Sequence, residues 1–231
     1  MEENCHNKYQ FQIEDKKITV YPCMISDRPV IYLNTFGTEG DQVYQILQEN
    51  GILNFTFVTV TGLLWEQDMT PWVIPSISKN SPPCTGGADH YLQLFTEEIV
   101  QKAEEKVELP ISFRGLAGYS LSGLFAVYSL YQTEIFSRIA SISGSLWFPD
   151  FKEYVFSHEM KICPDYIYFS LGNRESKTRN PYLKTVKEQT EAICNFYTQK
   201  EIDTVFQLNP GNHYSDTAKR TANGIRWIIN R

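Results

Sequence analysis

Short apolar runs alternate along this chain with longer stretches that carry apolar residues on one helical face. Apolar runs rich in β-branched residues are typical of strands, and apolar positions spaced about three to four residues apart are typical of amphipathic helices. The runs predict strands over 11–13, 18–21, 30–33, 55–60, 111–117, 138–143, 166–171 and 204–208. The periodic stretches predict helices over 41–49, 88–107, 124–131, 151–158, 180–200 and 217–229.

Strands and helices alternate from residue 30 onward, which predicts an α/β fold with a doubly wound, mostly parallel sheet. The first two predicted strands are joined by the short turn Glu14-Asp15-Lys16, so we expect antiparallel strands at the N-terminus. Because no repeat, linker or change of composition divides the sequence, we predict one domain over residues 1–231.

Residues 61–87 do not follow this alternation. They contain Trp65, Trp72 and several prolines, with little periodicity. Long segments without regular structure inside a compact domain are usually functional or disordered, and the aromatic side chains argue against disorder. We therefore predict a lid or substrate-pocket segment at about 61–87, with a merely packed connection as the alternative.

One strand is predicted to turn directly into a helix through Gly118, Ser120 and Gly123. A strand, a Gly-x-Ser turn and a helix form the nucleophile elbow, in which a strained turn exposes the serine hydroxyl. The usual second glycine of Gly-x-Ser-x-Gly is replaced by Ser122. The pattern predicts Ser120 as a nucleophile; the alternative is an ordinary serine in a tight turn.

A nucleophilic serine needs a base and a group that orients the base. His213 follows the last predicted strand, and functional residues gather at the carboxyl ends of strands in open α/β sheets. Glu175 follows the strand at 166–171 and is the expected acid, while Asp203, Asp216 or a Ser–His pair without an acid remain as alternatives. The other histidines lie in the polar N-terminus or in helical patterns, at His6, His90 and His158.

Negative charge on a tetrahedral intermediate needs backbone donors. We expect the amide of Leu121, the residue after the nucleophile, and an amide from the loop after an early strand, either Thr35 or Phe36. Aromatic residues near these loops are predicted to contact the substrate, namely Trp65, Trp72, Tyr119 and Trp147.

Composition excludes several classes of protein. The net charge is −6, so the chain lacks the basic footprint of nucleic-acid binding, and no apolar run is long enough to span a membrane. The polar start without an apolar core predicts no secretory signal, and five scattered cysteines predict reduced thiols in a cytoplasmic protein. We find no metal-ligand cluster and no nucleotide-binding loop, and therefore predict no metal and no cofactor. A homodimer is left open.

Several motifs together resemble the putative-esterase family of α/β-hydrolases, over roughly residues 30–229. They are 30–37, 118–125, Gly172-x-x-Glu175-x-Lys177-Thr178-x-Asn180-Pro181, 211–213, 86–89 and Asp68-x-x-Pro71-Trp72. The nearest branch is that of the enterochelin esterases, which hydrolyse siderophore trilactones. Two positions depart from the family pattern, Ser122 in place of glycine and Asn173 where many relatives have aspartate.

The resemblance implies an α/β-hydrolase fold and a serine carboxylic-ester hydrolase, with a small-molecule ester as its partner. We predict catalysis through an acyl-enzyme, on siderophore (enterobactin-like) trilactone esters. The alternatives are a feruloyl or acetyl-sugar esterase, an acyltransferase that uses the same residues, and a non-catalytic binding protein with a hydrolase fold.

Overall fold

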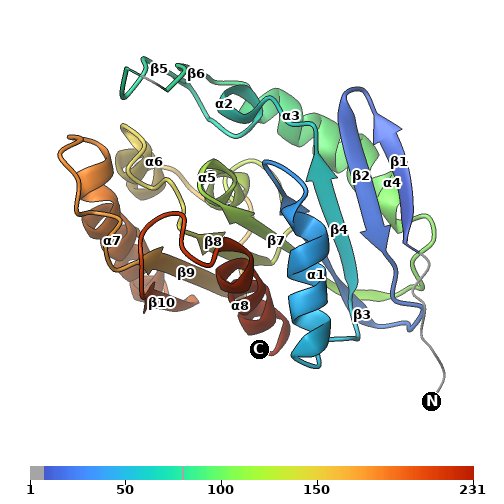
Figure 1. The fold of residues 1–231 in the computed structure, drawn as a ribbon. Helices are drawn as coiled ribbons and strands as arrows, with labels where there is room; N and C mark the ends of the chain where they lie inside the picture. The colour runs from blue at the N-terminus through green and yellow to red at the C-terminus, as the bar shows by residue number, and fades with distance from the viewer. Residues whose placement is uncertain (1–7, 80) are drawn as a thin grey trace.

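The computed structural model describes residues 8–79 and 81–231. The polar start of the chain, for which we predict no secretory signal and which contains Cys5 and His6, lies outside the described residues. The main sheet has eight strands in the order β1-β2-β4-β3-β7-β8-β9-β10 (Figure 1). They are β1 (Tyr9–Ile13), β2 (Lys16–Tyr21), β3 (Arg28–Asn34), β4 (Thr56–Thr61), β7 (Ile111–Tyr119), β8 (Arg138–Ile142), β9 (Tyr166–Gly172) and β10 (Asp203–Asn209).

The sheet is parallel from β4 through β10, and only its N-terminal edge is antiparallel. β1 pairs with β2 and β2 pairs with β4 in antiparallel register, whereas the other neighbouring strands are parallel. This confirms the predicted mostly parallel sheet with antiparallel N-terminal strands. Because the parallel strands run in one direction, their carboxyl ends lie on the same side of the sheet, where the connecting loops can form a site.

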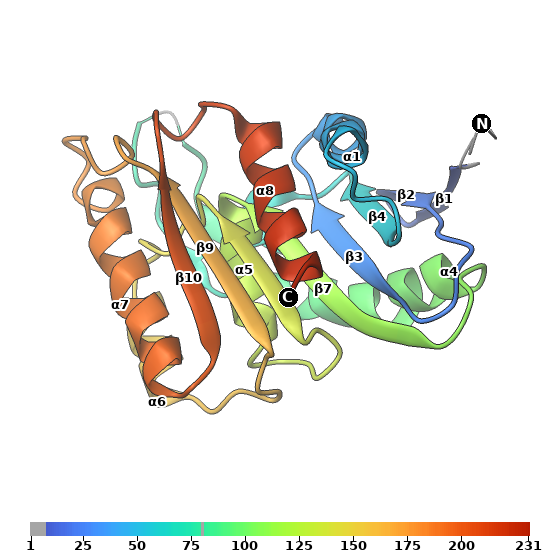
Figure 2. The same ribbon diagram turned by 90° about the horizontal axis from the view of Figure 1, so that it is seen from below.

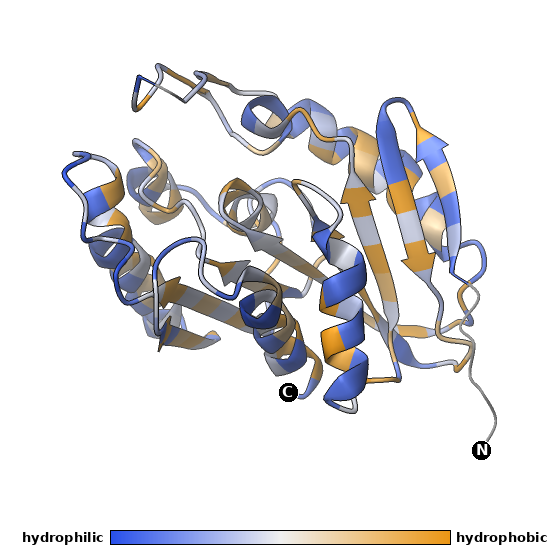
Figure 3. Cartoon of the chain, viewed as in Figure 1, coloured by the Kyte–Doolittle hydropathy of each residue, from blue (hydrophilic) through white to orange (hydrophobic). Residues whose placement is uncertain are grey.

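Helices cover both faces of the sheet (Figure 2). α1 (Glu39–Glu49) and α8 (Thr217–Ile229) pack on one face in an apolar cluster that includes Val43, Leu47 and Ile225. A larger cluster on the other face contains apolar residues from α3 (Ala88–Leu94), α4 (Val100–Glu104), α5 (Leu121–Ser129), α6 (Phe151–Ser157) and α7 (Val186–Gln199). Hydrophobic residues recur along β2 and β4, whereas α1 alternates between hydrophilic and hydrophobic positions (Figure 3).

The helix predicted over 124–131 spans Leu121–Ser129, and two other predicted helices differ more from the observed ones. The helical stretch that begins at Ala88 ends at Glu104 and contains a π-helical turn, Phe95–Ile99, which sequence periodicity does not reveal. The helix predicted from residue 180 begins only at Val186, after a short 3₁₀ turn. The reason is Asn180, whose side-chain oxygen accepts the N–H groups of the second and third residues after it and so holds a turn.

Residues 61–87 contain three very short elements, α2 (Trp65–Asp68), β5 (Val73–Ile74) and β6 (Cys84–Thr85). The β5–β6 pair is a separate two-stranded ribbon. Buried Asp68 anchors the segment through an ion pair of 2.7 Å with buried Lys16 on β2. Within the described part of the chain, no helix is both long enough and apolar enough to cross a membrane.

Candidate active site

The turn between β7 and α5 holds Ser120 in a strained conformation. Its φ is +61° and its ψ is −123°, a region that residues other than glycine rarely adopt. The predicted close approach of strand and helix is present. A Cβ on Gly118 would lie 2.1 Å from the carbonyl oxygen of Ser122, and a Cβ on Gly123 would lie 2.9 Å from the Cα of Gly144. The elbow therefore projects Ser120 at the carboxyl end of β7.

Ser122 braces the elbow at the position where the family pattern has glycine. Its buried hydroxyl accepts the Tyr119 N–H at 3.0 Å and donates to the Asn34 carbonyl oxygen at 2.9 Å. The Asn34 side chain in turn accepts the hydroxyl of Tyr91 at 2.6 Å. The serine thus joins the end of β7 to the end of β3. The loop that follows β3 is the one expected to supply an oxyanion donor.

Replacing Ser122 with alanine is expected to lower the free energy of unfolding by about 1–3 kcal/mol, because the half-buried Tyr119 N–H and the buried Asn34 carbonyl both lose the hydroxyl as a partner. Urea unfolding measures the loss. Ser129→Ala is the matched control, since Ser129 is equally buried on the same helix but bonds only to Ala126 of its own turn. Equal losses in the two variants would contradict the bracing role.

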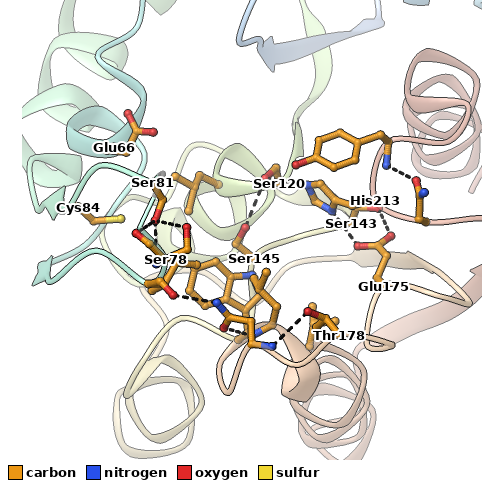
Figure 4. A pocket seen from close by; sticks show the side chains of 18 of the residues that line it. Glu66, Ser78, Ser81, Cys84, Ser120, Ser143, Ser145, Glu175, Thr178 and His213 are labelled. Atoms are coloured by element: carbon orange, nitrogen blue, oxygen red, sulfur yellow. Dashed lines mark hydrogen bonds and ion pairs between the residues drawn. The ribbon is translucent and has the colours of Figure 1, made fainter.

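The structure brings Ser120, His213 and Glu175 into one hydrogen-bonded chain (Figure 4). Ser120 Oγ lies 3.1 Å from His213 Nε2, and His213 Nδ1 lies 2.8 Å from Glu175 Oε2. The three residues come from the loops after β7, β10 and β9, all at the same sheet edge. Of the alternative acids, Asp203 starts β10 at the opposite end of that strand, and Asp216 precedes α8.

The Glu175 carboxylate is buried and fully hydrogen-bonded. Oε1 accepts the Ser143 hydroxyl at 2.7 Å, the Arg220 guanidinium at 2.9 Å and the Gly172 N–H. Burial by itself would raise the pKa of Glu175, but the hydrogen bonds from His213, Gly172 and Ser143 lower that pKa to about 2. The group is therefore a carboxylate throughout the neutral range.

Arg220 is a part of this site that sequence reasoning missed. Its side chain is almost fully buried and contacts Glu175, the Ser143 hydroxyl and the backbone oxygen of Asn212. It lies in the first turn of α8, so it joins the acid to the loop that carries His213. The sequence pattern that could have pointed to Arg220 is a cation in the first turn of the helix after the histidine loop, close to the apolar face of that helix.

Two further contacts fix the loops around His213. The Tyr119 hydroxyl donates to the His213 carbonyl oxygen at 2.6 Å. The Asn173 side chain accepts the Gly211 N–H at 3.2 Å and so joins the acid loop to the histidine loop. The amide at position 173 therefore has a structural contact of its own.

The predicted oxyanion donors have different surroundings. Among the described residues, no acceptor is bonded to the N–H of Leu121. The Thr35 N–H donates to the Val60 carbonyl oxygen at 3.0 Å, so it continues the sheet and is not free for a ligand. The Phe36 N–H donates to the side-chain carboxylate of Glu39 at 3.0 Å. Because a side chain can rotate away and a carbonyl of the sheet cannot, Phe36 stays the better candidate of the two.

Two cavities reach Ser120. The larger, of about 600 Å³, is lined by Trp65, Trp147, Arg174 and Lys177 together with the Ser-His-Glu chain. The smaller, of about 450 Å³, is lined by Phe36, Glu39, Trp65 and Tyr119 beside Ser120 and His213. Residues from 61–87 thus form one wall of both cavities, and in Figure 4 Glu66 and Cys84 lie across from Ser120.

Trp72 is the one predicted substrate contact that does not line either cavity. Its indole N–H donates to the Pro149 carbonyl oxygen at 3.1 Å, and its ring packs against Phe148 and Tyr154. Composition alone could not distinguish it from Trp65, because both tryptophans lie in the same irregular segment. Trp72 anchors that segment to the loop before α6.

Metal ligands do not gather in the described part of the chain. No group of three or more His, Cys, Asp or Glu side chains there could hold a metal ion. The four described cysteines are free thiols, at Cys23, Cys84, Cys163 and Cys194.

Both the sequence and the fold of this chain are similar to those of known proteins. The profile of the family described as Putative esterase matches residues 32–216. The structure is similar to an IroE-like serine hydrolase from Shewanella oneidensis, with a TM-score of 0.74 at 18% identity over 97% of this chain and 80% of that one. It is also similar to the siderophore hydrolase EstA from Aspergillus nidulans, with a TM-score of 0.71 at 18% identity over 97% and 94% of the two chains.

A third similar structure is the enterobactin and salmochelin hydrolase IroE, with a TM-score of 0.70 at 19% identity over 97% of this chain and 95% of that one. Identities this low establish the fold and leave the substrate undetermined. The predicted α/β-hydrolase fold is confirmed.

Proposed function

Because this chain belongs to the putative-esterase family, we propose that it is a serine esterase that works through an acyl-enzyme. Ser120 is the nucleophile, His213 the general base and Glu175 the third member of the triad. The observation that carries this assignment is the unbroken hydrogen-bonded chain from Ser120 Oγ through the His213 ring to a buried carboxylate.

The geometry supports a two-step reaction. His213 Nε2 takes the proton of Ser120 as Oγ attacks the ester carbonyl, and the imidazolium that forms is stabilised by the Glu175 carboxylate. The amides of Leu121 and Phe36 stabilise the tetrahedral oxyanion. His213 then returns the proton to the departing alcohol, which leaves an acyl ester on Ser120. Water, deprotonated by His213, hydrolyses that ester and releases the acid.

We assign siderophore-type trilactones as the substrate class. The larger cavity places the flat rings of Trp65 and Trp147 near two exposed cations, Arg174 and Lys177, neither of which forms an ion pair with another described residue. Catechol groups are aromatic and become anionic when they bind iron, so they suit such walls. The siderophore hydrolases of similar fold point to the same class of substrate.

Incubation with iron-bound enterobactin, followed by mass spectrometry of the linear products, tests this substrate. We expect ring opening at a higher kcat/KM than for a feruloyl or an acetyl-sugar ester. Lys177→Gln should raise KM for enterobactin and leave KM for p-nitrophenyl acetate unchanged, because only the first substrate carries catechols. Faster cleavage of the feruloyl ester would contradict the substrate class, but not the esterase activity.

Labelling with a fluorophosphonate separates the enzyme from a non-catalytic binding protein. We expect covalent modification of Ser120 in the wild type and none in His213→Ala, since the hydroxyl then has no base. An unlabelled wild type would reject the proposed mechanism.

A further inference from the structure

The two oxyanion donors are not equally available. The Leu121 N–H has no bonded acceptor among the described residues, whereas the Phe36 N–H donates to Oε1 of Glu39 at 3.0 Å. The neighbouring Gly37 N–H donates to the other carboxylate oxygen at 2.9 Å. A carboxylate of this protein therefore already holds the position in which Phe36 would bind a negatively charged oxygen.

Glu39 is placed to make this contact from inside the active site. It begins α1, where a carboxylate is favoured by the helix dipole, and the cap residue Thr38 makes no side-chain capping bond. The half-buried Glu39 lines the smaller cavity together with Phe36, Ser120 and His213. The carboxylate and the nucleophile thus border the same space.

We propose that Glu39 gates the oxyanion hole: its carboxylate binds the Phe36 amide in the resting enzyme and leaves it when the ester carbonyl binds. This inference rests on the proposed function. One N–H makes one strong hydrogen bond, and two negatively charged oxygens in front of it would repel each other. The free energy needed to break the Glu39 contact is therefore subtracted from the stabilisation of the transition state.

If Glu39 gates the oxyanion hole, removal of its carboxylate should speed ester hydrolysis. Glu39→Ala should raise kcat/KM for p-nitrophenyl acetate about tenfold, the factor expected for one charge-assisted hydrogen bond that no longer has to be broken. Glu39→Gln keeps a neutral acceptor and should show a smaller rise. Glu49→Ala is the matched control, because Glu49 is an exposed carboxylate at the other end of the same helix.

A boronic acid distinguishes a gate from a residue that merely shapes the loop. Ser120 Oγ adds to the boron of phenylboronic acid, its proton passes to His213, and the anionic tetrahedral boronate places one of its hydroxyl oxygens at the hole. The inhibition constant should fall in Glu39→Ala by about the factor by which kcat/KM rises.

Unchanged or lower kcat/KM in Glu39→Ala, or weaker boronate binding, would overturn the proposal. If Glu39→Ala does not fold, the same two measurements on Glu39→Gln decide. Fluorophosphonate labelling of Ser120 in the wild type tests the esterase mechanism independently, so a failed gate does not count against the triad.

Discussion

Ser120→Ala should eliminate ester hydrolysis, with a fall in kcat of about 10⁵–10⁶-fold. The change removes the hydroxyl that we propose is acylated, whereas the proposed oxyanion donors and the cavity walls remain. The fold should persist because alanine is no bulkier than serine and should be no more strained at this position, where Ser120 has a φ of +61°. Initial rates with p-nitrophenyl butyrate, together with circular dichroism, measure the two effects separately.

Ser157→Ala provides the control for this experiment. Ser157 is an exposed serine at the end of α6 and does not line either cavity. Wild-type rates are expected for it. If folded Ser120→Ala kept more than about 1% of the wild-type turnover, hydrolysis would not depend on this hydroxyl and the assignment would be wrong.

The elbow could be found from sequence because its signal is local. A largely apolar strand, small residues and a helical pattern occur within a few positions, and steric limits leave few conformations for that combination. The structure supplies what the motif cannot: Ser122 replaces the usual glycine and hydrogen-bonds two strands. No local rule predicts this, since the partners Tyr119 and Asn34 meet only after β3 and β7 pair.

The order of the proposed triad residues along the chain could also be predicted, because parallel topology places successive carboxyl strand ends on the same side of the sheet. Glu175 could be singled out as the carboxylate that follows β9. Arg220 could not, because its contact with Glu175 joins the loop after β9 to the first turn of α8, which are separated in sequence by α7 and β10. A long-range ion pair of this kind depends on the packing of α8 and has no sequence spacing that marks it.

Irregular segments limited the prediction of substrate contacts. Trp65 and Trp72 are close in sequence, yet one lines both cavities and the other packs against Phe148. Without a helical or strand period, the direction of a side chain cannot be inferred. The π-helical turn at Phe95–Ile99 was hidden for a related reason, because its residues fit the apolar pattern of an ordinary helix.

Glu175→Gln should lower kcat by about 10⁴-fold without unfolding the protein. Three donors, from Ser143, Arg220 and Gly172, converge on Oε1, so the amide oxygen of a glutamine is held there. The amide NH₂ must then face His213 Nδ1 and donate to it. That forces the tautomer with a proton on Nε2, which cannot accept the proton of Ser120. Steady-state kinetics should show the loss in kcat with KM nearly unchanged.

The two carboxylates that sequence alone left as alternatives are the controls for this variant. Asp203 lies at the far end of β10 and Asp216 makes no side-chain capping bond, so Asp203→Asn and Asp216→Asn should retain wild-type rates. A large loss in either one, with activity preserved in Glu175→Gln, would mean that the acid is not Glu175.

¹⁵N NMR of His213 tests the tautomer directly. It should show protonated Nδ1 in the neutral wild-type ring and protonated Nε2 in Glu175→Gln. An unchanged tautomer would mean that the carboxylate does not orient the base, whatever the effect on rate.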